Sequence, residues 1–507
     1  MSIYTLDFVA IVAALICLRS FLAWRRRHAY SYPLPPGPKG LPIIGNILDM
    51  PGGNEWETAR QWGAKYGDLV YIKNLGTGYL FLNLYEDAIE LFEKRGSVYS
   101  SRPQTTMLDL EGWSDWFTSV IPYGDNLRTA RQYFNRIFQR SITKNYYDVQ
   151  TQSTHKLLCK LVQDPDHYRR HIRQAAAEAI IKIAYGYEIS ENDPAVDVID
   201  TGIRSVSDAL AFYLVNAVPV LRYLPAWFPG AHFQKVAKKG NEIAIAMYSE
   251  PYNEARKRMA DGTATPSMLS KLTELYGRGD NETFIAQTVA VAFGAGGDTT
   301  VSALLTFLLA MVLFPDAMKK GHEELDRVIG KHTLPSFEDR PRLPYIEAIC
   351  KECLRWQAIT PLAVPHLAEK DDIFKGYFIP AGTVLYGNVW AMLRDPKRYP
   401  DPDKFIPDRW LPAYGEEPPL EADKMAFGFG RRICPGRFFA ENSIFIGVAS
   451  ILATFNIEKA VDEHGVPITP TEDYLSSIVR HPKPFKCKIT PRSDASVLAV
   501  RQATKQL

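Results

Sequence analysis

The chain has 507 residues, of which 46% are hydrophobic, 12% aromatic and 23% charged. This composition allows a large buried core and excludes wholesale disorder, while a net charge of +2 without a basic stripe argues against nucleic acid as a partner. No repeat, low-complexity linker or long charge run divides the chain, so we expect one large domain. The six cysteines are too sparse for a disulfide framework, which favours a reducing compartment.

The chain opens with an apolar stretch, residues 3–24, which Arg25-Arg-Arg-His28 follows at once. Its length is close to the ~20 residues that cross a bilayer, so we predict a membrane anchor with a basic stop in residues 1–28. A cleaved signal peptide is the alternative, but there the positive charges precede the apolar run. The positive-inside rule places residues 29–507 in the cytosol, which in a eukaryote predicts a single-pass protein of the endoplasmic reticulum membrane.

Residues 33–42 are rich in proline and can form neither a helix nor a central strand, so we expect a stiff, extended hinge between anchor and domain. Residues 68–84 alternate β-branched, aromatic and leucine side chains around Gly76-Thr-Gly78, which predicts a pair of strands. Farther along, residues 223–230 gather Tyr223, Trp227 and Phe228 between two prolines. Such a loop either packs inward or enters a membrane interface.

Residues 283–314 are strongly apolar and helix-compatible, interrupted by Ala295-Gly-Gly-Asp-Thr-Thr300. A transmembrane span is the alternative, but Asp298 at the centre is costly in hydrocarbon, so we predict a core helix. The glycine pair allows close approach of a flat cofactor, and the Thr299 hydroxyl can bond to its own helix and open it locally. Asp298 and Thr299, side by side, suit a proton relay.

Glu352-Cys-Leu-Arg355 places opposite charges one helical turn apart, an arrangement that is often only a surface ion pair. The flanking Cys350 and Cys353 have the spacing of a redox or zinc dipeptide. No second pair of cysteines or histidines lies nearby in the sequence, so we interpret them as core packing. After this helix, we expect residues 362–366 to form a strand.

The loop Phe427-Gly-Phe-Gly-Arg-Arg-Ile-Cys-Pro-Gly436 presents one cysteine just before a predicted buried helix, residues 437–455. The positive N-terminal end of that helix favours a thiolate at Cys434, which suits a metal ligand. An inert buried cysteine is the alternative for a lone residue of this type. Gly430 and Gly436 let backbone N–H groups approach the sulfur, and Phe427 can shield it from water.

The pattern Phe427-x-x-Gly430-x-Arg432-x-Cys434-x-Gly436 resembles the heme-binding loop of the cytochrome P450 family. The hexad at 295–300 is similar to the helix I signature of this family, and Glu352-x-x-Arg355 with residues 405–410 resembles its charged motifs. The resemblance covers nearly the whole chain. It implies a mainly α fold with a small β-sheet region, in which one large catalytic domain follows an N-terminal membrane anchor.

The resemblance also implies heme b as cofactor, with its iron on Cys434. Arg432 suits the acidic edge of the cofactor, and Arg102, Arg131 and His366 match the positions that hold its propionates. The family usually has tryptophan four residues before that second arginine, where this chain has Leu127. The further roles implied are a charged network bracing the heme loop (Glu352, Arg355, Arg409) and walls of the substrate pocket (Phe293, Leu362, Ala363, Val364, Ile478).

By this resemblance the chain is a heme-thiolate monooxygenase that uses O2 to hydroxylate or otherwise oxidise a lipophilic small molecule. No flavin or nicotinamide motif occurs in the sequence, so electrons would come from a separate NADPH–cytochrome P450 reductase, with cytochrome b5 as a second candidate donor. Basic residues around the helix that carries Arg131 could form the docking face for such a donor. The sequence as a whole is similar to those of family members that act in fungal secondary metabolism.

Two alternatives remain open from the sequence. One is a heme-thiolate isomerase or peroxygenase that needs no reductase, and the other is a non-enzymatic membrane heme sensor or carrier. The intact pair of Asp298 and Thr299 argues against both, because neither of them needs a proton relay for O2 activation.

Overall fold

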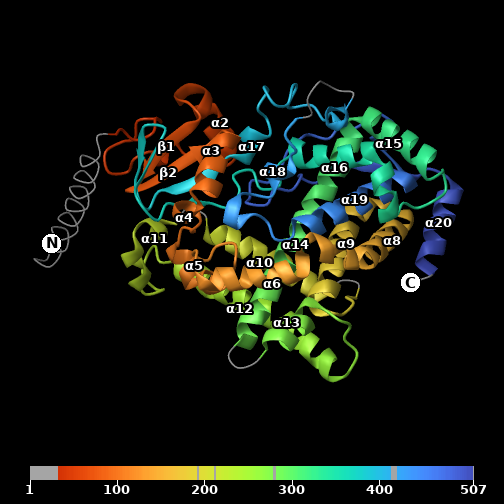
Figure 1. Ribbon diagram of the computed structural model, residues 1–507, viewed down its shortest axis with the longest axis horizontal. Helices are drawn as coiled ribbons and strands as arrows, with labels where there is room; N and C mark the ends of the chain where they lie inside the picture. Colours follow the sequence, from red (N-terminus) through yellow and green to blue (C-terminus); the bar gives the residue numbers. More distant parts are fainter. Residues whose placement is uncertain (1–31, 191–192, 211–212, 278–280, 413–418, 506–507) are drawn as a thin grey trace, which may run out of the picture.

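The computed structural model describes residues 32–190, 193–210, 213–277, 281–412 and 419–505. The expected anchor in residues 1–28 lies outside the described residues. The chain forms a helical body with a four-stranded sheet toward one end, where the described part of the chain begins (Figure 1). The helices are α2 Glu55–Tyr66, α3 Tyr85–Ala88, α4 Gly96–Tyr99, α5 Thr106–Leu110, α6 Asp125–Phe138, α7 Arg140–Thr143, α8 Tyr147–Gln163, α9 Tyr168–Tyr185, α10 Pro194–Ala209, α11 Leu214–Ala217, α12 Phe233–Ala260, α13 Met268–Tyr276, α14 Asn281–Leu313, α15 Pro315–Val328, α16 Pro344–Trp356, α17 Val389–Met392, α18 Asp423–Ala426, α19 Arg437–Thr454 and α20 Asp494–Lys505.

The predicted strand pair is confirmed as β1 and β2, which are antiparallel with Leu69 opposite Leu82. These strands belong to a four-stranded sheet of order β1-β2-β6-β3, in which β2 and β6 run parallel. The strands are β1 Leu69–Asn74, β2 Thr77–Leu82, β3 His366–Leu367, β4 Asp372–Phe374, β5 Tyr377–Ile379, β6 Val384–Gly387, β7 Phe455–Lys459 and β8 Cys487–Pro491. Residues 33–40 form neither helix nor strand, as the prolines require.

The expected strand over residues 362–366 is wrong in extent, because β3 begins only at His366. Ala363 has φ +54°, which a strand does not accommodate, and Pro365 has no N–H with which to pair. The segment is therefore a turn that leads into the sheet.

The long apolar helix is confirmed as α14, which runs through the middle of the molecule (Figure 1). It is apolar on nearly all sides because α9, α10, α12, α16 and α19 pack around it. In the described part of the chain it is the one helix long and apolar enough to cross a membrane, yet 78% of its most apolar window is buried inside the protein. Burial at this level fits the predicted core position.

The buried helix predicted after Cys434 is α19, which begins at Arg437 and packs against α14. Gly447 allows the close approach, since a Cβ atom at this position would lie 2.9 Å from a methyl group of Leu304 on α14. The cysteine loop is thereby fixed at one end of a helix that lies against the helix carrying Asp298 and Thr299.

Candidate active site

Cys434 lies in a tight loop whose shape depends on the backbone. Its N–H donates to the Phe427 carbonyl oxygen at 2.8 Å, which closes the loop that the sequence predicted. Gly430 has φ +52°, and a Cβ atom there would lie 2.2 Å from the Phe92 carbonyl oxygen, so only glycine fits. The loop is therefore set by steric demands as well as by hydrogen bonds.

Burial raises the pKa of the Cys434 thiol, while a hydrogen bond from the Gly436 backbone and the charges of Arg131 and Arg437 act in the opposite direction. The residue as a whole is only partly buried. A sulfur that lies in the interior and receives a backbone N–H can bind a soft metal.

Arg102, Arg131 and Arg432 form a cationic cluster beside this loop. Within the described chain, the hydrogen bonds of their guanidinium groups go to backbone carbonyl oxygens and to no carboxylate. Burial, followed by the charge of Arg432, lowers the pKa of Arg102 well below its usual range, and burial lowers the pKa of Arg432 to about 10. Buried cations without counter-charges are costly, so the cluster fits a ligand that brings negative charge.

His366 completes this cluster from β3. It is almost fully buried, and one ring nitrogen lies 2.6 Å from the Tyr99 carbonyl oxygen. Burial first, and then the charge of Arg102, lowers the pKa of His366 well below its usual range. A neutral imidazole here can donate one hydrogen bond without adding to the positive charge.

One face of α14 is uncovered although its surroundings are core. Ala295 is exposed and Thr299 is partly uncovered, and these positions are four residues apart on the same side of the helix. The Thr299 hydroxyl donates to the Ala295 carbonyl oxygen at 2.8 Å, as predicted. The helix remains continuous there, so the predicted local opening is wrong.

Asp298 has a partner that the sequence did not reveal. Its Oδ1 lies 2.9 Å from Nε2 of His481, which belongs to the segment before β8. Both side chains are nearly buried, at 10% and 12% exposure. No short-range pattern links residues 183 positions apart, so sequence spacing could not identify this contact.

The predicted pocket walls differ in burial. Leu362, Ala363, Val364 and Ile478 are only partly covered, whereas Phe293 is 0% exposed and packs edge-on against Tyr185. Two residues along a helix correspond to about 200°, so Phe293 points away from the uncovered face at Ala295. The assignment of Phe293 to the pocket is wrong for this geometric reason.

Glu352, Arg355 and Arg409 form a fully buried network, as predicted. Arg355 binds both carboxylate oxygens of Glu352 at 2.8 and 2.9 Å, and Arg409 Nε lies 3.2 Å from Oε1. Trp410, which the prediction did not include, donates its indole N–H to Oε2 at 2.9 Å. The network connects α16 with the turn η8 (Pro407–Trp410).

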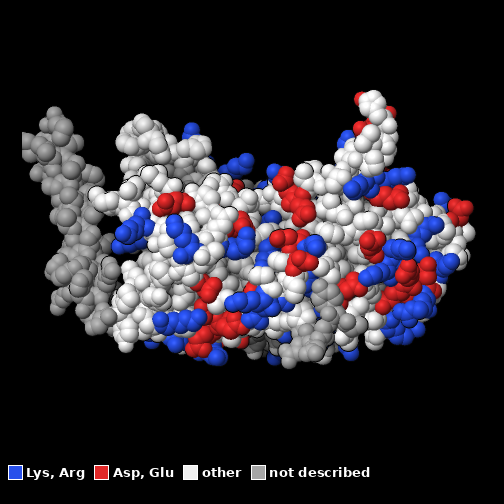
Figure 2. Space-filling model, turned by 90° about the horizontal axis from the view of Figure 1, so that it is seen from above, with Lys and Arg blue, Asp and Glu red and all other residues white. Residues whose placement is uncertain are grey.

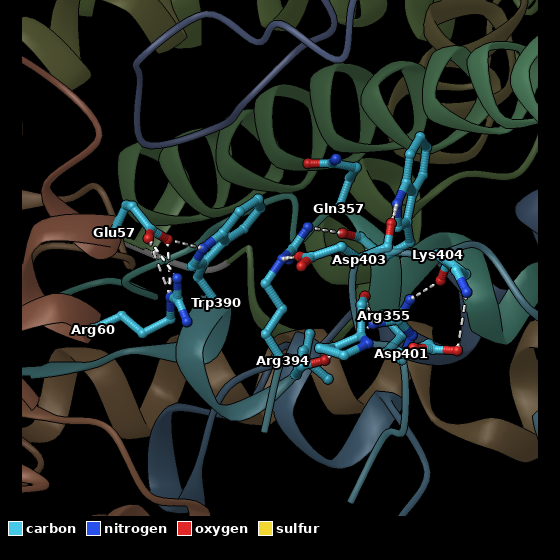
Figure 3. Close-up of polar contacts among 12 residues, drawn as sticks. Glu57, Arg60, Arg355, Gln357, Trp390, Arg394, Asp401, Asp403 and Lys404 are labelled. Carbon is cyan, nitrogen blue, oxygen red and sulfur yellow. Dashed lines mark hydrogen bonds and ion pairs between the residues drawn. The ribbon is translucent and has the colours of Figure 1, made fainter. Parts of the chain in front are cut away.

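Arg355 also ties this network to the chain that follows α17. Figure 3 shows its guanidinium pointing at the backbone of Lys404, to whose carbonyl oxygen it donates at 2.9 Å. A further bond reaches the Pro402 carbonyl oxygen at 2.6 Å. The same view includes Glu57 and Arg60, an ion pair of the same i,i+3 spacing, in which Arg60 is 49% exposed.

Cys350 and Cys353 are both buried in the core, and burial raises the pKa of each thiol well above its usual value. No cluster of three or more metal-binding side chains occurs among the described residues. Their environment agrees with the core-packing interpretation.

Comparison with known proteins identifies the family of this chain. The family model described as Cytochrome P450 matches residues 35–489. Cytochrome P450 monooxygenase 208 of Postia placenta is 40% identical over 96% of both chains, and cytochrome P450 monooxygenase claR of Ampulloclitocybe clavipes is 36% identical over 99% of this chain and 93% of its own. Tryptamine 4-monooxygenase of Psilocybe cyanescens is 38% identical over 92% of this chain and 94% of its own.

The chain therefore belongs to the cytochrome P450 family, and it is a monooxygenase with a heme-thiolate iron cofactor. The partly buried Cys434, the cationic cluster and the uncovered face of α14 fit what such a cofactor would need: a sulfur ligand, counter-charges for its two propionates and room for a flat ring. O2, a redox partner and a lipophilic substrate follow from this class of enzyme.

Proposed function

We propose that this monooxygenase oxidises a lipophilic small molecule in fungal secondary metabolism, with electrons from a separate NADPH–cytochrome P450 reductase. The observation that carries the proposal is the partly buried Cys434 beside two buried arginines, Arg102 and Arg432, and the half-buried Arg131. None of the three has a carboxylate partner among the described residues. The relatives support the finer statement, since one of them is named for a reaction on tryptamine.

In this proposal, Cys434 is the axial ligand, and Phe427, Gly430 and Gly436 shape its loop. Arg102, Arg131 and Arg432 hold the propionate edge. His366 joins them when its ring N–H leaves the Tyr99 carbonyl oxygen, because a neutral imidazole has only one N–H to donate. The cofactor, when bound, supplies the redox chemistry that activates O2, and a thiolate ligand favours cleavage of the O–O bond.

Thr299 and Asp298 have separate tasks during O2 activation. The Thr299 hydroxyl, on the uncovered face of α14, turns away from the Ala295 carbonyl oxygen and passes a proton toward the reaction site. Asp298, on the adjacent helix position, resupplies that proton. General acid assistance of this kind is worth about 10²–10⁴-fold in rate.

The membrane is the proposed source of the substrate. Tyr223 and Trp227 are 81% and 80% exposed, so the aromatic loop does not pack inward. Ile43 and Leu48, near the start of the described chain, are also exposed. In Figure 1, α11, which precedes the aromatic loop, lies at the same end of the molecule as β1 and β2, so these apolar groups suit one membrane-facing end.

The proposed docking face for the reductase lies on α6 and the turns that follow it. Four basic side chains are exposed there. Two lie on α6, which also holds Arg131, and two follow it: Arg128, Arg136, Arg140 and Lys144. The face of the molecule shown in Figure 2 instead mixes positive and negative side chains without a stripe of one sign. A local basic group of this kind steers an acidic partner, with the reductase as first donor and cytochrome b5 as second.

The function is tested in microsomes that contain the full chain and a reductase and are fed candidate terpenoid, polyketide and aromatic amine substrates. We expect a product with one added oxygen that requires both NADPH and O2. Product formation without NADPH and reductase would replace this proposal by the isomerase or peroxygenase alternative. Deleting residues 1–28 should release much of the protein from membranes with the heme spectrum intact, and loss of heme would instead place that segment in the core.

A further inference from the structure

Three polar side chains form one stripe along the otherwise apolar α14. Asp298, Ser302 and Thr306 are spaced by four residues and therefore lie above one another on the same face. All three pair with one segment near the C terminus, residues 474–481, which we call the strap. A stripe of this kind in a core helix indicates a specific docking contact, because each polar group is costly to bury without a partner.

Two of the three contacts only fasten the strap. The Ser302 hydroxyl donates to the Arg480 carbonyl oxygen, and the hydroxyl groups of Thr306 and Tyr474 lie 3.0 Å apart. Arg480 further packs its guanidinium over the rings of Trp56, Trp390 and Tyr474 at 4.4–4.8 Å. The strap thus has several anchors besides Asp298.

The third contact involves the residue to which we assign proton resupply. Nε2 of His481 lies 2.9 Å from Oδ1 of Asp298. A carboxylate oxygen only accepts, so the hydrogen resides on Nε2. The charge of Asp298 also acts on Arg173, but Arg173 forms its ion pair with Asp200 on α10. His481 is therefore the group that fixes where the carboxylate points.

We propose that His481 is a positioning residue for proton delivery, which holds the Asp298 carboxylate beside Thr299 through its Nε2–H. The strap thereby links a pocket wall, Ile478, to the relay three residues farther on. This inference rests on the proposed function, because it assigns a role within the same reaction.

Adjacent positions on a helix point about 100° apart, so the Asp298 side chain leaves α14 in a different direction from Thr299. A carboxylate free to rotate in this place would sample several orientations, whereas one held by an imidazole has a fixed one. Misplacing a catalytic group by about 1 Å can cost about 10²-fold.

The test compares His481→Leu, which removes the hydrogen bond, with His481→Gln, which retains an N–H donor of similar reach. Ser302→Ala is the matched control, since it loosens the same strap without touching Asp298. Each full-length, heme-loaded variant is assayed for product, hydrogen peroxide and NADPH consumption. We expect His481→Leu to lower product per NADPH at least about tenfold, while His481→Gln and Ser302→Ala stay close to wild type.

Hydrogen exchange of peptides covering residues 474–482 provides a readout besides activity. We expect His481→Leu and Ser302→Ala to raise exchange to a similar extent, which shows that the strap loosens equally in both. If Ser302→Ala also uncouples the enzyme, or His481→Gln is as impaired as His481→Leu, the role of His481 is structural and the inference is overturned.

The double variant Asp298→Asn/His481→Leu shows whether His481 acts through Asp298. We expect it to be no more uncoupled than Asp298→Asn alone, whereas independent, additive losses overturn the inference. If the wild type and His481→Leu form the same amount of product per NADPH, the inference is contradicted but the proposed function stands. A wild type that forms no product with NADPH and reductase contradicts the proposed function itself.

Discussion

Thr299 and Thr300 make the same kind of hydrogen bond, each from its hydroxyl to the carbonyl oxygen four residues earlier, at 2.8 and 3.0 Å. Thr300 is buried, while Thr299 is partly uncovered on the side of Ala295. A hydroxyl must be reachable to pass a proton, so the two neighbours should differ in function despite their identical chemistry.

We expect Thr299→Ala to keep heme, substrate binding and NADPH consumption but to divert electrons to hydrogen peroxide, since the proton donor is lost. Product per NADPH should fall by up to about 10²–10⁴-fold. Thr300→Ala is the matched control and should remain coupled. Unchanged coupling in Thr299→Ala, measured from product, peroxide and NADPH together, would remove the threonine from the relay.

Among the elements, the cysteine loop depends on two glycines in different ways. Gly430 has positive φ and faces the Phe92 carbonyl oxygen, whereas a Cβ atom on Gly436 would meet only the Cys434 sulfur, at 4.0 Å. The first position excludes any side chain, and the second leaves space for a methyl group.

We therefore expect Gly430→Ala to yield little heme-loaded protein, because the loop must move to relieve the clash. Gly436→Ala should fold and retain heme. Heme content per purified chain measures both. Equal heme content in the two variants would show that the loop adapts and that the close contact of Gly430 does not set its shape.

The buried network between α16 and η8 should behave differently from the surface pair of the same spacing. Arg355→Ala leaves Glu352 buried with only Arg409 as a cation, so we expect a loss of about 3–5 kcal/mol in unfolding free energy and poor heme loading. Arg60→Ala, in the exposed pair with Glu57, should cost less than about 1 kcal/mol.

Denaturant unfolding of both variants checks this comparison. A stable, fully heme-loaded Arg355→Ala variant would return the Glu352–Arg355 pair to the status of an ordinary ion pair. A large loss in Arg60→Ala would show that spacing, and not burial, decides the cost.

At the scale of the whole molecule, the sequence predicted the elements whose signals are local. The apolar run with its polar hexad became α14, and the predicted strands β1 and β2 are joined by a turn at Leu75 and Gly76, one residue earlier than the predicted Gly76-Thr-Gly78. The charged network was also predictable, because its residues match family motifs. Ala363 shows the limit of such patterns, since its positive φ depends on the path that the chain must take into the sheet.

Contacts between distant segments that carry no motif could not be predicted. His481 has no motif, and its relation to Asp298 exists only because the strap crosses α14. Similarly, the carbonyl partners of Arg102 come from loops that are far apart in the chain, Ser119 and residues 364–365. Tertiary packing decides such contacts, and one sequence records no trace of them.

Burial of histidines makes the stability of the whole molecule sensitive to acid. Burial lowers the pKa of His155 and His171 and lowers that of His322 to about 4. The unfolded chain takes up protons below pH about 6.5 that the folded chain does not bind. Stability is therefore fully present above that pH and is lost as the pH falls toward 4, by about 3 kcal/mol from His322 alone.

We expect the denaturation midpoint to fall between pH 7 and pH 5, and His322→Gln to reduce this fall, because glutamine does not titrate. Urea unfolding of the full chain at pH 7 and at pH 5 measures this change in the midpoint. An identical pH dependence in His322→Gln would contradict the burial argument for this residue.

The central claim is that Cys434 is the thiolate ligand of a heme held by the cationic cluster. The most direct measurement is the absorption spectrum of the reduced protein with carbon monoxide, for wild type and Cys434→Ser, with Cys353→Ser as a control at a cysteine packed in the core. The account predicts the red-shifted Soret band of a thiolate-bound heme in wild type and Cys353→Ser, and its loss in Cys434→Ser. An unchanged band in Cys434→Ser would contradict the account.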